Sequence, residues 1–314
     1  MPYAKGGDVG VVLAQQVLAG QPAPQLDTPK KATLAIVCLC AGVAPLAARW
    51  IAHDTARIAY GLLLAAAYLA GTLFARDRPA LCRFWRLSSA FFVLAVVQVL
   101  NNTIPSYVGT GILHDPPNSG NPLASTVSGT ISIQLIETGI AIATIVAVTK
   151  LSGQDLDSIY GRVGKLSRWF VFSVAAFLVI YALTIVGPGR SSRLLPTNST
   201  LTLDYILALT PALLVLVISN GFQEELLFRG LFLRQYNTFF GLHEATLLQA
   251  VIFAIAHVGV TYTPSAVLFA FAVALPLGLI TGYLMRATDG VVAPAIFHAG
   301  ANIPIYLAFL SYVV

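Results

Sequence analysis

The sequence predicts an all-α protein, a polytopic bundle of about eight or nine transmembrane helices. Composition is the first reason: 57% of the 314 residues are hydrophobic, only 10% are charged, and the mean hydropathy is +0.80. Soluble domains carry about 25% charged residues, so this chain has too few polar side chains to cover a globule in water. The second reason is a series of apolar runs, most of them near the roughly 20 residues that a helix needs to cross hydrocarbon.

These runs divide the chain into three parts. A cytoplasmic tail is expected at 1–32, transmembrane helices of unknown role at 33–150, and a functional core at 151–314. The first run has no small-residue cleavage site behind it, so we expect an uncleaved span rather than a signal peptide. The seventh run is short, which leaves a partial or re-entrant helix open. The predicted spans are 33–52, 57–75, 87–105, 128–149, 169–187, 204–222, 245–260, 265–285 and 291–313.

The basic residues predict the orientation of these spans. With a cytoplasmic N-terminus, most of the 18 Lys and Arg residues fall in inner segments, whereas the loop 106–127 has none and falls outside. We therefore expect the N-terminus inside and the C-terminus outside, in the inner or plasma membrane of the cell. The formal charge of +5 is interpreted as this topology signal and not as a nucleic-acid-binding surface.

Two further features have no assigned chemistry. The inner segment 150–168 mixes charges with spaced apolar residues, and it is expected either to lie along the anionic inner leaflet or to form a solvated loop. Cys38 and Cys40 are two residues apart on a predicted helix and point in different directions, and Cys82 is far along the chain. We expect these cysteines to be buried in the bundle rather than to form a disulfide or a metal site.

Glu224 and Glu225 stand side by side at the end of an apolar run, followed by Arg229. Ionisable residues are expensive in hydrocarbon, so such a cluster is by default a hypothesis of a functional site. Residues four apart share a helix face, so Arg229 is predicted to pair with Glu225 and to leave Glu224 free to act as a base. The alternative is a charged helix end at the cytoplasmic surface.

Two more polar clusters interrupt the later apolar runs. His257 closes the run Phe253-Ala-Ile-Ala-His257, and His298 and Asn302 lie four residues apart in the last run. Taken singly, His257 is typical of a helix end, and Asn302 of a hydrogen bond between helices. Taken with the glutamates they predict a site for amide hydrolysis. A carboxylate and a histidine can deprotonate water, and a second histidine with an amide can stabilise an oxyanion.

The order Glu-Glu-Leu-Leu-Phe-Arg-Gly, Phe-x-x-x-His and His-x-x-x-Asn resembles the CPBP family, also called ABI. Its members are intramembrane endopeptidases that include type II CAAX prenyl proteases, and bacteriocin-processing or immunity proteins. The resemblance covers about residues 204–306 and implies a CPBP-type core in the C-terminal half. It also implies a substrate that is a peptide or protein at the membrane, prenylated or not.

The resemblance implies a role for each site residue. Glu224 would activate water with help from His257, and Glu225 would support it while held by Arg229. His298 and Asn302 would form the oxyanion hole. A glutamate-based mechanism without a cofactor is favoured, and zinc is the alternative, although the close His-Glu-x-x-His spacing of soluble zinc proteases is absent. The rival functions are a non-proteolytic immunity or scaffold protein of the same family, and a transporter or channel.

The predicted spans leave one geometric difficulty. Glu224 falls at the inner end of its span, whereas His257 lies about 12 residues into the next one, roughly 18 Å along an ideal helix. Straight helices would keep the two side chains too far apart to share a water molecule. We therefore expect the sixth helix to continue past Glu225, or the seventh to be tilted or broken.

Overall fold

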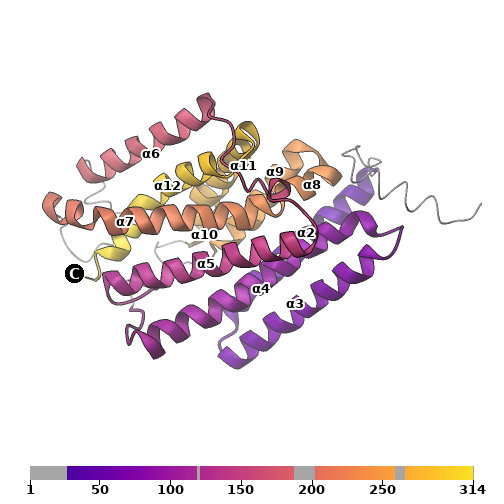
Figure 1. Cartoon of the computed structure of the whole chain (residues 1–314), viewed down its shortest axis with the longest axis horizontal. Helices are drawn as coiled ribbons and strands as arrows, with labels where there is room; N and C mark the ends of the chain where they lie inside the picture. The colour runs from indigo at the N-terminus through magenta and orange to yellow at the C-terminus, as the bar shows by residue number, and fades with distance from the viewer. Residues whose placement is uncertain (1–26, 119–120, 187–201, 259–265, 314) are drawn as a thin grey trace, which may run out of the picture. The chain divides into compact units, whose positions relative to one another are not determined.

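The structure is a computed structural model that describes residues 27–118, 121–186, 202–258 and 266–313 (Figure 1). Most of the predicted tail 1–32 thus lies outside the described residues. Within them the regular elements are all helical, and eight helices are long and apolar enough to cross a membrane. The all-α, polytopic architecture is confirmed, with a span count inside the predicted range.

The helices follow the predicted runs closely. The seventh run is α9 (Leu242–Ala256), a 15-residue helix that is shorter than the roughly 20 residues a crossing needs. The helices of the eight spans are α2 (Thr28–Ala47), α3 (Asp54–Arg76), α4 (Trp85–Tyr107), α5 (Val127–Leu151), α6 (Arg168–Val186), α7 (Leu203–Glu224) continuing into α8 (Leu233–Phe240), α10 (Ala266–Phe269) continuing into α11 (Leu275–Thr288), and α12 (Val292–Leu310).

The chain forms two compact units, of which the smaller comprises residues up to Val99 together with Arg234–Ala245. Here α3 packs on α2, where the Tyr68 hydroxyl donates to the Ala41 carbonyl at 2.7 Å. All three cysteines are free, but only Cys38 is buried, while Cys40 is exposed and Cys82 is half-buried. The expected burial of all three cysteines is therefore wrong, because α2 turns Cys40 away from its neighbours.

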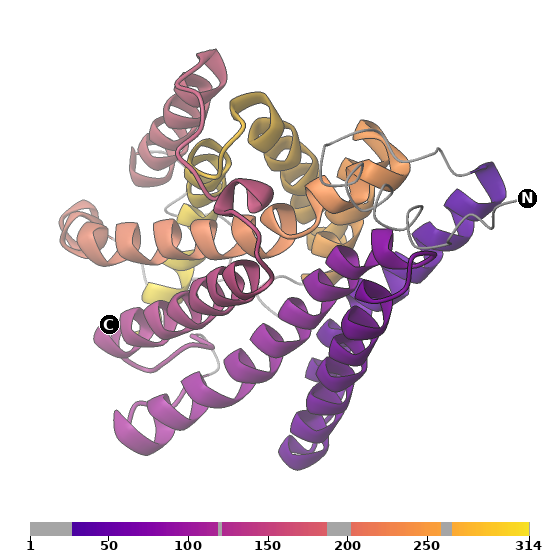
Figure 2. The ribbon, with the colours of Figure 1, turned by 45° about the vertical axis from the view of Figure 1, so that its right-hand side comes forward.

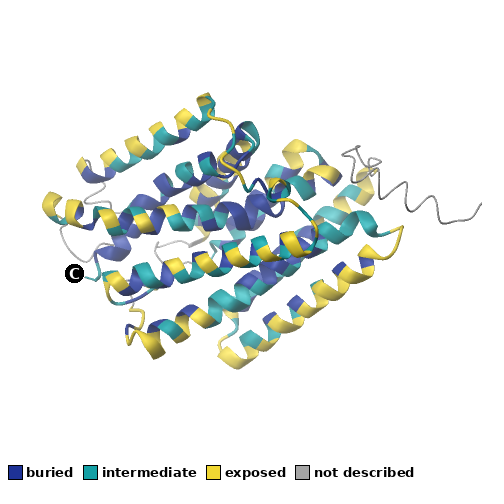
Figure 3. Cartoon of the chain, viewed as in Figure 1, coloured by how far each residue is buried: buried dark blue, intermediate teal, exposed yellow. Residues whose placement is uncertain are grey.

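The larger unit comprises Leu100–Leu233 and Thr246–Val314, and α12 is at its centre. This helix contacts α6, α7 and α11, and α7 also contacts α5; Figure 2 shows α5 and α7 running side by side. With 67% of its apolar window buried, α12 is the most buried candidate span (Figure 3). A site carried by α7 and α12 is therefore held by the best-packed part of the unit.

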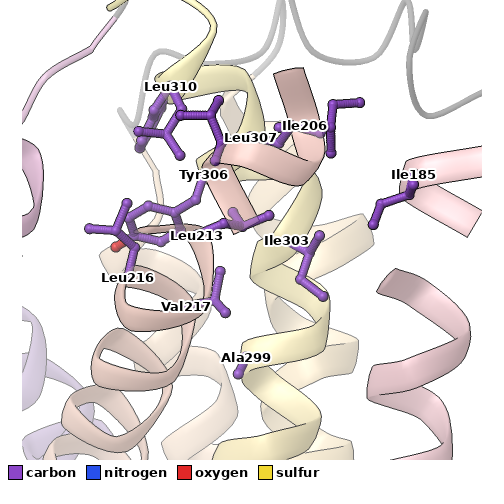
Figure 4. Close-up of a cluster of buried hydrophobic side chains, with 12 residues drawn as sticks. Ile185, Ile206, Leu213, Leu216, Val217, Ala299, Ile303, Tyr306, Leu307 and Leu310 are labelled. Carbon is purple, nitrogen blue, oxygen red and sulfur yellow. The ribbon is translucent and has the colours of Figure 1, made fainter. Parts of the chain in front are cut away.

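A buried apolar cluster fixes α7 against α12 and α6. It draws Leu213 and Leu216 from α7, Ile303 and Leu307 from α12, and Ile185 from α6 (Figure 4). Since lipid is as apolar as these side chains, their packing, rather than exclusion from water, holds the helices together. This packing fixes the distance between α7 and α12 next to the helix segments that carry the polar residues.

Gly221 marks the closest approach of the two helices. A Cβ atom at this position would lie 2.7 Å from the Ala295 carbonyl oxygen and 3.2 Å from the Ala299 amide nitrogen. Small residues allow transmembrane helices to approach closely in this way. Glu224 and Glu225 follow within one turn, and His298 lies between these two contact points on α12, so the close approach brings the glutamates next to the histidine.

The segment 150–168, after α5, packs against the turn between α11 and α12. Arg162 Nε donates to the Asp289 carbonyl at 2.8 Å, and Lys165 N donates to the Thr288 carbonyl at 2.6 Å. This packing on the protein itself is an arrangement that neither the leaflet nor the solvated-loop alternative included. It also brings the α11–α12 turn next to the segment 150–168.

Candidate active site

The first polar cluster lies where α7 ends in a π-helical turn, Glu225–Gly230. Glu225 Oε1 and Arg229 Nη1 are 3.1 Å apart, and both side chains are fully buried. The predicted pairing of these two residues is thus present in the structure. The Glu224 side chain, in contrast, is 20% exposed. One carboxylate is paired and closed to solvent, and its neighbour is partly exposed.

His298 connects the two glutamates. Its Nδ1 atom is 2.7 Å from Glu225 Oε1, a hydrogen bond, and its Nε2 atom is 3.5 Å from Glu224 Oε2. The side chain is buried, with 2% of its surface exposed. A carboxylate on one ring nitrogen fixes the orientation of an imidazole. Glu225 therefore directs Nε2 of His298 towards Glu224.

His257 approaches Glu224 from α9. Its Nε2 atom is 3.9 Å from Glu224 Oε2, and its Nδ1 atom is 2.8 Å from the Phe253 carbonyl oxygen. The predicted span boundaries had kept these residues apart. The structure removes the difficulty because α7 does continue past Glu225, through the π-helical turn, before α9 brings the chain back.

Asn302 reaches Glu224 through a residue that the sequence reasoning missed. Asn302 Nδ2 donates to Asn220 Oδ1 at 2.7 Å, and Asn220 Nδ2 donates to Glu224 Oε1 at 3.3 Å. Asn220 precedes Glu224 by four residues in an apolar run, the same spacing that identified Arg229. The spacing of four residues could therefore have identified Asn220 as a candidate site residue from the sequence.

Phe253 forms the apolar wall of the buried part. The Arg229 guanidinium lies 4.0 Å from the centre of this ring, and the ring meets His298 edge to face, with centroids 5.7 Å apart. An aromatic face stabilises a desolvated guanidinium. The Phe-x-x-x-His motif thus supplies two things: His257, and the Phe253 ring that supports the Glu225–Arg229 pair.

Helix α5 brings a second residue that the sequence reasoning missed. Glu137 lies within electrostatic range of Glu224, and it interrupts an apolar run as the other site glutamates do. Next to it, Gln134 Nε2 and Thr138 Oγ1 donate to Gln223 Oε1 at 3.1 and 2.9 Å. An ionisable residue in a span was the available signal, but its partner on another helix is not visible in the sequence.

The arrangement can hold a water molecule beside a base. Glu224 Oε2 is buried and accepts no hydrogen bond from a described residue, although two imidazole nitrogens lie within 3.9 Å. Distances slightly longer than a hydrogen bond suit bridging by water. In the described part of the chain, no group of three or more His, Cys, Asp or Glu side chains is placed to hold a metal ion.

Comparison with known proteins agrees with the motifs. Residues 206–304 match the family model described as type II CAAX prenyl endopeptidase Rce1-like. No curated protein and no solved structure matches the chain. The matched segment contains all six predicted site residues, and Asn220. Together with the eight candidate spans, the match makes the chain an integral membrane protein with a CAAX-type endopeptidase core. Over residues 206–304 the chain is therefore similar to the Rce1-like type II CAAX prenyl endopeptidases.

Proposed function

We propose that the protein hydrolyses a peptide bond with a water molecule that Glu224 activates. The observation that carries this proposal is the position of Glu224 Oε2, 3.5 Å from His298 Nε2 and 3.9 Å from His257 Nε2. A general base must reach the proton that it removes directly or through one water. A water between these three groups is in reach of the carboxylate, and the imidazoles orient it.

In the proposed reaction the water oxygen attacks the carbonyl carbon while Glu224 takes its proton. Charge then develops on the carbonyl oxygen, and the C–N bond breaks as the proton passes from Glu224 to the leaving nitrogen. His298 Nε2–H and Asn302 Nδ2 donate to the developing oxyanion. Asn302 has a donor for this because an amide has two N–H groups and only one is used on Asn220.

Glu225 acts on this reaction through His298. It accepts a hydrogen bond from Nδ1, so donation from Nε2 as well requires the doubly protonated ring, whose charge the carboxylate of Glu225 would balance. Arg229 Nη1 lies 3.1 Å from the same oxygen, Oε1, and its positive charge holds the carboxylate in place. Preorganised donors of this kind contribute about 2.7–4 kcal/mol each to transition-state stabilisation.

The proposed substrate is a membrane-associated peptide or protein processed near its end in the CAAX manner, prenylated or not. The family match supports the CAAX class. Catalysis by glutamate without a metal remains the favoured mechanism, with zinc as the alternative, because the proposed roles of Glu224, His257 and His298 need no Lewis acid.

The test compares the wild type with Glu224→Gln in liposomes, on a mixed library of prenylated and unprenylated peptides. Gln keeps the size of Glu but cannot take a proton, so we expect kcat/KM to fall by about 10²- to 10⁴-fold while insertion and melting temperature stay unchanged. Glu244→Gln is the matched control, because Glu244 is exposed and lies outside the site.

Each other outcome has a defined meaning. Cleavage retained by Glu224→Gln would remove the assigned role. Loss of wild-type cleavage with a chelator, restored by zinc, would make the protein a metalloprotease. A folded wild type that cleaves no peptide of the library would favour the non-proteolytic immunity or scaffold function.

A further inference from the structure

We infer that Gln134 of α5 is a positioning residue of the proposed active site, because its side chain fixes the end of α7, which carries Glu224, against α12. The inference rests on the proposed function, since it assigns Gln134 an effect on the geometry of that reaction. Gln134 lies outside the segment 206–304 that the family model matches. The inference therefore adds α5, a helix before the matched segment, to the elements that hold the site.

The first contact of Gln134 is with the last turn of α7. Its Nε2 atom donates to Gln223 Oε1 at 3.1 Å, and Thr138, one turn further along α5, donates to the same oxygen at 2.9 Å. The Nε2 atom of Gln134 also donates to the Thr138 hydroxyl oxygen at 3.2 Å. Since Gln223 directly precedes Glu224, these bonds limit the movement of the backbone that carries the proposed base.

The second contact of Gln134 is with α12. The Tyr306 hydroxyl donates to Gln134 Oε1, and the Tyr306 ring belongs to the buried apolar cluster between α7 and α12 (Figure 4). Tyr306 follows Asn302 by four residues, so the two lie on the same face of α12. Asn302 in turn donates to Asn220 of α7 at 2.7 Å. Gln134 thus holds the face of α12 that carries the proposed oxyanion donor Asn302.

The chemistry of an amide suits this bridging position. We call Gln134, Thr138, Gln223 and Tyr306 the Gln134 network, and all four are buried. Buried hydrogen bonds strengthen one another in such a network. An amide both accepts, here from α12, and donates, here to α7. A carboxylate would lack the donor and an ammonium group would lack the acceptor, so replacing the amide breaks at least one link between helices.

The Gln134 network joins the two helices whose spacing the proposed reaction needs. Glu224 is on α7 and the proposed oxyanion donors are on α12, so the base and the donors are aligned only while both helices are fixed. Misplacement of a reacting group by about 1 Å can lower a rate by about 10²-fold. Within the described residues, the Gln134 side chain bonds to the other members of its network and not to the reacting groups. Its role is therefore positioning.

The kinetic experiment compares the wild type with Gln134→Met in liposomes, on a peptide that the wild type cleaves. Met keeps the length of Gln but has no amide. We expect kcat to fall by about 10- to 100-fold, while KM stays within about twofold because no contact with the substrate is lost. Tyr306→Phe and Thr138→Val each remove one hydroxyl of the network and should lower kcat in the same sense. Thr138→Ser restores the hydroxyl and should restore kcat.

Thr130→Val is the matched control for a loss of stability alone. Thr130 is a buried threonine of the same helix, and its hydroxyl accepts from Asn121 Nδ2 at 2.7 Å, outside the Gln134 network. We expect this variant to lower the melting temperature and to leave kcat unchanged. An equal fall of kcat in Thr130→Val and Thr138→Val would overturn the inference. A rise of KM alone in Gln134→Met, or no recovery in Thr138→Ser, would also overturn it.

A double-mutant cycle tests whether Gln134 and Tyr306 act through one network. Residues in one hydrogen-bond network have effects that do not add. The variant with both Gln134→Met and Tyr306→Phe should therefore have nearly the kcat of Gln134→Met. Additive effects on log kcat would show that the two residues act separately, and they would remove the proposed link from α5 to α12.

A measurement without substrate separates this inference from the proposed function. In a background with the three cysteines replaced by alanine, spin labels on Ala143→Cys of α5 and Ile218→Cys of α7, both exposed positions, report the distance between the helices. Gln134→Met should shift or broaden the distances measured by pulsed EPR, and Thr130→Val should not. Unchanged distances in Gln134→Met contradict the inference even if peptides are cleaved. A shift in a protein that cleaves no peptide supports the positioning and counts against the proposed function.

Discussion

Arg229 and Glu225 form an ion pair that is closed to solvent on both sides. Removing one partner of a buried pair strands the other charge, which typically costs about 3–5 kcal/mol. We therefore expect Arg229→Ala to lower the melting temperature in detergent and the yield of folded protein. Lys150→Ala is the control, because Lys150 and Asp155 form an exposed pair that is worth about 0–1 kcal/mol. A normal melting temperature for Arg229→Ala would contradict the importance of the pair.

The residues of the candidate site show how far the sequence can predict a constellation. Spacing four residues apart identified the Glu225–Arg229 pair, because it is a property of one helix. The contacts of His298 with both glutamates depend on how α12 is rotated against α7, and only the motif resemblance pointed to them. Glu137 was missed because its apolar run gives no sign of the helix that it faces.

At the scale of single elements, the approach of α7 to α12 at Gly221 decides whether the site assembles. Gly221→Ala would force a methyl group against the Ala295 carbonyl, and we expect overpacking to cost about 1–3 kcal/mol. Cleavage should fall as well, because His298 and Glu224 would move apart.

Gly139 of α5 is the matched control for this change, because a Cβ atom there meets no atom within 4 Å. Gly139→Ala should be neutral or stabilise the protein by about 0.4–1 kcal/mol, since alanine restricts the unfolded chain. Melting temperatures and cleavage rates of the two variants test the difference. Equal melting temperatures and equal cleavage rates for Gly221→Ala and Gly139→Ala would show that the close approach of α7 to α12 is not needed.

The start of α5 depends on the carboxylate of Asp115. Ser125 N and Ser125 Oγ donate to its Oδ1 at 2.8 and 2.6 Å, and the hydroxyl of Thr126, the N-cap of α5, donates to its Oδ2. Burial raises the pKa of Asp115, but the hydrogen bonds from Ser125 and Thr126 outweigh it and leave the pKa below its usual value.

A lowered pKa in the folded state gives a defined pH dependence. The stabilisation by Asp115 should be complete above the unfolded pKa of about 3.9, and it should be lost as the pH falls through the lower folded pKa. Asp115→Asn should lower the melting temperature at pH 6 and flatten its decline below pH 4. The exposed carboxylate of Asp155 provides the control variant Asp155→Asn. If the melting temperature of Asp115→Asn depended on pH as that of the wild type does, Asp115 would not stabilise the start of α5 in this way.

At the scale of the whole molecule, the open question is which side of the membrane each loop faces. The predicted topology places Pro117 outside and Asp155 inside. In a background with the three cysteines replaced by alanine, an impermeant thiol reagent applied to intact cells should label Pro117→Cys and leave Asp155→Cys unlabelled. Both positions should be labelled after the membrane is opened. The reverse pattern would invert the topology.

The span count shows where sequence reasoning on this scale succeeds and where it stops. Hydropathy predicted each of the eight candidate spans in the described residues, because apolar length is a local property. It could not decide how the short seventh run behaves, since α9 is apolar but has only 15 residues. Whether such a helix crosses depends on the residues around it, which hydropathy does not describe.

The π-helical turn limits the lengths that this part of the chain can adopt. Its i→i+5 winding contains one more residue than an α-helical turn. Deleting one residue from 226–230 would leave five residues in a turn that now has six, so the side chains after Glu225 would be presented at other angles. Arg229 would then leave Glu225, and Phe228 would leave Phe253, whose ring it meets edge to face with centroids 5.2 Å apart. A change of one residue is absorbed in most surface loops, but here it would separate the base from the histidines, so the protein can vary in length only elsewhere.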